Sequence, residues 1–128
     1  MTFIMPEQLL QQFKWEAASW KRQLDFLQHE NAWLKTRIAE LAGDHLPIEL
    51  LPEIEQFQSN SVADDYAITQ FKRYLEIFIN ELNAASGKDL DINYTIKKQG
   101  LIRDNIEMLE HGFKKLKKEF NQSMVSKL

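Results

Sequence analysis

Apolar residues recur along residues 7–42 at alternating steps of three and four. A spacing that averages 3.5 residues keeps one seam of a helix facing a partner helix when the two supercoil left-handedly. The segment is also rich in strong helix formers, so it predicts one long helix of the coiled-coil type. The seam consists of Leu10, Phe13, Ala17, Trp20, Leu24, Leu27, Asn31, Leu34, Ile38 and Leu41.

Asn31 is the one strongly polar residue in this seam. A single buried Asn costs stability in a coiled coil, but two of them can hydrogen-bond across a parallel dimer and fix its register. The flanking charges agree with such a pairing, which places Glu16 near Lys21 and Glu30 near Lys35 of the other copy. We therefore expect the seam to mediate self-association as a homodimer, or pairing with another helical protein.

A helix in an antiparallel bundle within one chain shows the same seam, and this alternative stays open because Trp20 is bulky for a two-stranded interface. The first helix also has a second apolar face, where an isolated coiled coil carries charges. We expect the rest of the chain to cover that face and a second copy to cover the seam. The second face consists of Trp15, Ala18, Phe26, Ala32, Trp33 and Ala39.

Gly, Pro and small polar residues divide the rest of the chain. The run Ser59-Asn60-Ser61 breaks a helical pattern and separates a short helix from a longer one. The predicted segments are a helix over residues 7–42, a linker over 43–52, a short helix over 53–58, a helix over 62–84, a loop over 85–91 and a helix over 93–122.

Helix starts have local signals. Ser61, with Asp64 three residues later, resembles a capping box and predicts the start of the second main helix. Asp91 or Asn93 is expected to cap the third. A short strand over residues 92–96 is an alternative without an evident partner strand.

The second and third main helices each carry one broad apolar stripe. Leaving such stripes in water would cost more than the roughly 5–15 kcal/mol by which a domain is stable, so the helices must pack together. We predict a single all-α domain over residues 1–128, an elongated bundle of three main helices and one short helix. The stripes are Ile68, Phe71, Leu75, Phe78 and Leu82, and Ile102, Ile106, Leu109, Phe113, Leu116 and Phe120.

Composition narrows the class of protein. The 128 residues include no Cys, which excludes disulfides and thiolate metal sites and favours a cytoplasmic location. A net charge of −3 makes nucleic acid an unlikely partner, and no stretch is long and apolar enough for a membrane span.

Leu27–Leu41 resembles the zipper half of a basic-zipper factor, over fifteen residues. The twenty residues before it lack the basic excess of such factors, so DNA binding is not implied.

Candidate chemistry is sparse. His29 follows Asp25, and His111 follows Glu107, by one helical turn, a spacing that can help build a metal site. Both His residues point away from the apolar stripes, so solvated faces explain them better. No nucleophile or phosphate-binding motif is present, and we expect no enzyme activity, cofactor or metal.

A basic segment lies among apolar residues of the third helix and consists of Lys114, Lys115, Lys117 and Lys118. Such a segment is usually a solvated helix end, although it could bind an anionic partner. The favoured function is a non-catalytic interaction or scaffolding module that self-associates. The alternatives are a bundle that binds a small molecule or metal and, less favoured, a nucleic-acid or membrane-surface accessory.

Overall fold

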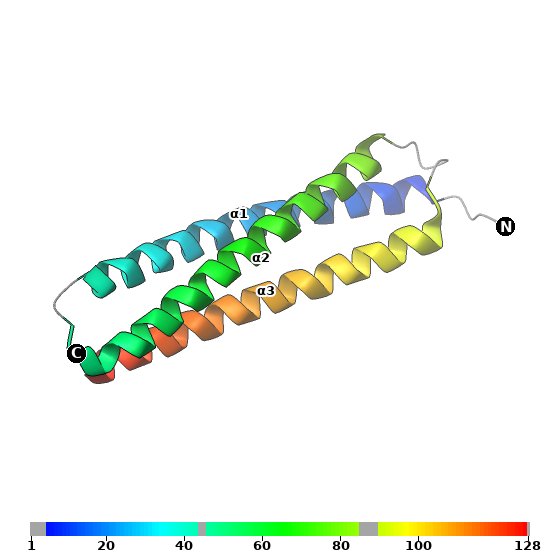
Figure 1. Cartoon of the computed structure of the whole chain (residues 1–128). Coiled ribbons are helices and arrows are strands. Elements are labelled where there is room, and N and C mark those ends of the chain that lie inside the picture. Colours follow the sequence, from blue (N-terminus) through cyan, green and yellow to red (C-terminus); the bar gives the residue numbers. More distant parts are fainter. Residues whose placement is uncertain (1–4, 44–45, 85–89, 128) are drawn as a thin grey trace.

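The chain folds into an elongated three-helix bundle. The computed structural model describes residues 5–43, 46–84 and 90–127. Successive helices run in opposite directions (Figure 1). The predicted all-α bundle is confirmed. Its elements are α1 over Glu7–Gly43, the short 3-10 helix η1 over Ile48–Leu50, α2 over Leu51–Ala84 and α3 over Ile92–Lys127.

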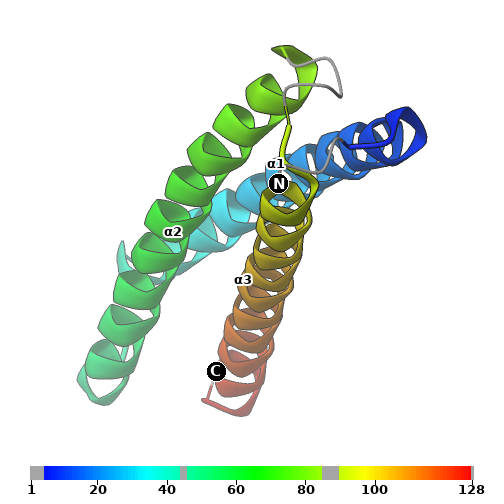
Figure 2. The same ribbon diagram turned by 90° about the vertical axis from the view of Figure 1, so that its right-hand side faces the viewer.

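The three helices have similar lengths of 37, 34 and 36 residues, so each spans roughly 50–55 Å at 1.5 Å per residue. α1 crosses obliquely behind the other two when the bundle is viewed from its end (Figure 2). Its contact with α2 is much more extensive than its contact with α3. The boundary between α1 and α3 is therefore the more open side of the bundle.

α2 is continuous through the predicted break at residues 59–61. Ser61 does not cap a helix; its hydroxyl donates to the carbonyl of Gln58 at 2.9 Å, and its side chain is fully buried. The predicted short helix over 53–58 is the first part of α2. Packing outweighs the weak helix propensity of Ser and Asn because the buried positions keep their spacing through this point. They are Ile54, Phe57, Ser61, Ile68, Leu75, Phe78 and Leu82.

α3 begins where the capping signal predicts. The Asp91 carboxylate accepts a hydrogen bond from the backbone N–H of Tyr94 at 3.1 Å. Residues 92–96 are helical, so the alternative of a short strand is wrong. α3 also runs past residue 122, and near its end Met124 is buried and the Ser123 hydroxyl donates to Glu53 of α2. Most of the predicted loop, residues 85–89, lies outside the described residues.

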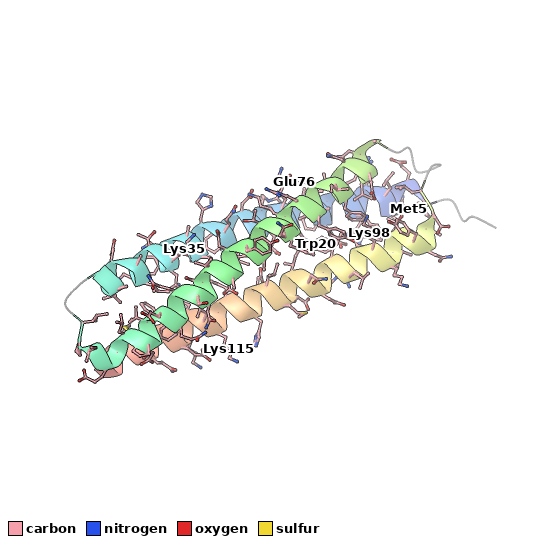
Figure 3. All side chains as sticks on the ribbon, viewed as in Figure 1. Met5, Trp20, Lys35, Glu76, Lys98 and Lys115 are labelled. Atoms are coloured by element: carbon pink, nitrogen blue, oxygen red, sulfur yellow. The ribbon has the colours of Figure 1, made fainter. Side chains whose placement is uncertain are left out.

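The core runs along the axis between the helices. Trp20, 9% exposed, projects inward from α1 (Figure 3). At the far end, Phe57 of α2 and Phe120 of α3 meet edge to face with ring centroids 5.4 Å apart. A third helix provides the space for Trp20 that a two-stranded interface would lack.

Candidate interaction surface

The heptad seam of α1 is filled from within the chain. All ten seam residues are buried, and they form one hydrophobic cluster with residues of α2 and α3. The intrachain alternative therefore accounts for the seam. A second copy could reach it only if the bundle opened.

Asn31 faces α2 instead of another Asn31. Its side-chain amide donates to the carbonyl of Ser61 at 3.0 Å, and the residue has no exposed surface. Among the described residues, two buried side-chain nitrogen or oxygen atoms have no hydrogen-bond partner. They are Oδ1 of Asn31 and Oε1 of Gln99. The polar position in the seam is thus matched to a position of α2 in the same chain.

The charged residues beside the seam also have partners within the chain. Lys35 pairs with Asp65 at 3.6 Å, so its predicted contact with Glu30 of another copy is not needed to explain it. Glu16 accepts hydrogen bonds from Gln12 and Gln99. A shorter ion pair, 2.6 Å between Lys72 and Asp25, also joins α2 to α1.

Lys21 and Glu30 differ in their surroundings. Lys21 is exposed, whereas Glu30 is half-buried and lines a hollow between α1 and α3.

The outer side of α1 carries large aromatic residues in water. Trp15, Phe26 and Trp33 are 68%, 67% and 57% exposed. The expectation that the rest of the chain covers this second face is wrong, because α2 and α3 pack on the seam instead. Ala32 and Ala39 on the same face are exposed as well. We call Trp15, Phe26 and Trp33 the aromatic line.

Two open hollows lie between α1 and α3, beside the aromatic line. Trp15 and Trp20 line the first with Arg103 of α3. Phe26 lines the second with Lys114 and other residues of α3. A partner seated on the aromatic line could therefore also reach α3.

The other helices also expose apolar residues, though none as large as Trp. Tyr66 and Ile77 are exposed on α2, and Tyr94, Leu101 and Met108 are exposed on α3. Tyr94, Leu101 and Met108 recur every seven residues and therefore share one side of α3, so that alignment alone does not distinguish α1. The two Trp and one Phe of the aromatic line are larger side chains, and they mark α1 as the main candidate surface.

Lys98 holds α2 and α3 together. Its ammonium lies 5.3–5.5 Å from the ring centroids of Tyr74, Phe78 and Tyr94, and 3.2 Å from the carboxylate of Glu81. Burial lowers the pKa of Lys98, but the hydrogen bonds with Tyr94 and Glu81 outweigh it and leave the pKa above its usual value. This cluster joins α2 to α3 near the start of α3.

The predicted titratable candidates do not converge. His29 is exposed, and its Nδ1 lies 2.7 Å from the backbone carbonyl of Asp25, not from the carboxylate. His111 is also exposed, and His45 lies outside the described residues. Within the described ranges, no three His, Asp or Glu side chains come together as a metal site. Burial raises the pKa of Asp64, which lines an open hollow on the α2–α3 side.

The basic segment is the solvated end of a packed helix. Lys114, Lys115 and Lys118 are exposed, while Lys117 is half-buried. Leu116, which lies between these Lys residues, and the flanking Phe113 and Phe120 are buried in the core. Lys115 lines the same hollow as Asp64, so an acidic side chain of α2 lies near the segment.

Among the helices in the described part of the chain, none combines the length and apolar character that crossing a bilayer requires. No protein-family model, no curated protein and no solved structure matches the chain.

Proposed function

We propose that this chain is a non-catalytic interaction module that self-associates through the aromatic line of α1. The observation that carries the proposal is the exposure of Trp15, Phe26 and Trp33 on one side of α1. Trp and other aromatic residues are enriched where proteins meet, because they bury much area while losing little conformational entropy. The aromatic line supplies such anchors on a preformed surface.

The available area is consistent with a dimer. An aromatic side chain can bury about 150–250 Å². Two copies contribute three such side chains each, and at the observed exposures these six supply roughly 600–950 Å². A stable interface usually buries about 1,200–2,000 Å² in total. Neighbouring turns of α1 and the rim of α3 at the two hollows would provide the remainder.

The charge around the aromatic line favours a protein partner. Arg22 and Arg37 lie beside it, but Glu30 and Glu40 balance them. Anionic lipid and nucleic acid instead select surfaces with a clear basic excess. A second copy of the chain offers the same mixture of aromatic and balanced charged residues, and we commit to it as the occupant.

Mass in solution tests the proposal. Light scattering after gel filtration, from about 1 to 100 µM, should show a mass that rises toward that of a dimer. Trp33→Glu should weaken association by roughly 1,000-fold, because each of two anchors contributes about 2 kcal/mol. Met108→Glu is the matched control, since Met108 is 72% exposed on α3 and should leave the dimer intact.

Circular dichroism should show that both variants keep their helices. A parent chain that stays a monomer throughout this range would refute self-association. Loss of the dimer in Met108→Glu but not in Trp33→Glu would place the interface on α3 and refute the assignment to α1.

A further inference from the structure

The outer side of α1 carries a line of exposed residues with symmetric spacing. The steps along this line are seven, seven, four, seven and seven residues, so its two halves mirror each other about residue 24. Seven residues are close to two helical turns and four are close to one, so the line stays within roughly 40° around the helix. This longer line contains the three residues of the aromatic line together with three polar residues. It consists of Gln8, Trp15, Arg22, Phe26, Trp33 and Glu40, all exposed.

We infer that two copies pair through this line in antiparallel orientation, with a two-fold axis at the level of Leu24. This inference rests on the proposed self-association and adds its orientation and register. The axis brings Trp15 opposite Trp33 of the second copy and Arg22 opposite Phe26 of the second copy. Each contact occurs twice, as a two-fold symmetric interface requires.

The chemistry of the facing residues supports this register. Two indoles can stack with an offset, and a guanidinium is attracted to the face of a Phe ring. Gln8 would face Glu40 of the second copy, so its amide N–H can donate to the carboxylate. The line therefore places an aromatic, cationic or hydrogen-bonding group opposite one that complements it at every step.

A parallel in-register pairing of the same line lacks this complementarity. It would place Arg22 against Arg22 and Glu40 against Glu40 of the second copy. Like charges that face each other at an interface oppose association. The antiparallel arrangement removes both clashes, because neither Arg22 nor Glu40 faces itself.

Cross-linking distinguishes the two orientations, and the absence of Cys makes introduced thiols unique. Gln8→Cys in unlabelled protein is mixed with Glu40→Cys in nitrogen-15-labelled protein, and a short bismaleimide is added. In the antiparallel dimer the two thiols face each other, whereas the two positions 8 lie roughly 48 Å apart along the axis. Gln70→Cys, an exposed position on α2, is the control for random collision.

We expect most of the cross-linked product to contain one unlabelled chain and one labelled chain, which gives a mixed mass. Gln8→Cys alone should cross-link no more than Gln70→Cys. Adding Trp33→Glu to the Glu40→Cys chain should abolish the mixed product. Cross-linking of Gln8→Cys to itself would overturn the antiparallel register while leaving self-association intact. Cross-linking at the control level for every variant, together with a monomeric mass, would refute the proposed function as well.

Discussion

Asn31 offers a direct test of how the seam is filled. Replacing it with Val removes the hydrogen bond to the Ser61 carbonyl, which contributes about 1 kcal/mol. That carbonyl lies inside α2 and keeps its own helical hydrogen bond, so the change leaves no orphaned acceptor. The loss is therefore limited to one amide contact.

Two gains oppose that loss. The substitution removes a buried Oδ1 without a partner, whose desolvation costs about 1–3 kcal/mol. It also adds apolar surface at a position with no exposure, where burying a Val side chain is worth about 1.5 kcal/mol or more. Allowing for imperfect packing and for the lower helix propensity of Val, we expect a net stabilisation of about 1–3 kcal/mol.

Thermal unfolding followed by circular dichroism measures this effect. For a chain of this length, the expected gain corresponds to a rise in Tm of roughly 4–12 °C. Asn31→Ala is the matched control; it removes the same amide but leaves a cavity, so its Tm should lie below that of Asn31→Val. The mass distribution should not change in either variant, because Asn31 faces Ser61 of its own chain.

A fall in Tm for Asn31→Val, with helix content and mass unchanged, would refute this reasoning. It would mean that the amide contributes more than its one hydrogen bond accounts for. A change in the mass distribution would instead show that Asn31 takes part in assembly, as the parallel dimer predicts.

Lys98→Met should lower the free energy of unfolding by about 1–2 kcal/mol, because it removes the ammonium from three aromatic rings and from Glu81. Urea unfolding measures this loss. An unchanged urea midpoint would show that these contacts are not stabilising. Since burial raises the pKa of Asp64, the folded state binds the proton more tightly than the unfolded state, and stability falls as pH rises through the raised pKa. Asp64→Asn should therefore be more stable than the parent chain near neutral pH, and the difference should disappear below the ordinary pKa of Asp; a difference independent of pH would refute this.

Local patterns were sufficient for the fold class and for most of the core. The 3.5-residue period selects one set of side chains, and all ten are buried because no other face of α1 is apolar over its whole length. The same spacing continues through Ser61, which could have indicated that α2 does not break there. The low helix propensity of Ser59, Asn60 and Ser61 favours a break, but the continuous row of buried residues outweighs it.

The candidate surface could be recognised only in part. Sequence alone identified Trp15, Phe26 and Trp33 as apolar residues away from the seam, but the expectation that α2 and α3 cover them is wrong, because all three are exposed. The spacing of apolar residues indicates which face of a helix is to be buried, but it does not indicate which helix packs against that face. In the folded chain α2 and α3 are nearly as long as α1 and fill its seam, so the aromatic line remains in water.

The sequence by its spacing therefore determined three amphipathic helices and the side of each that is buried. Tertiary structure alone decided that the seam is filled in cis, that Asn31 meets Ser61, and that the outer side of α1 is exposed. The physical reason is that hydrophobic burial is proportional to area and does not depend on which chain supplies it. Only the geometry of the packed helices selects between cover from within the chain and cover from outside.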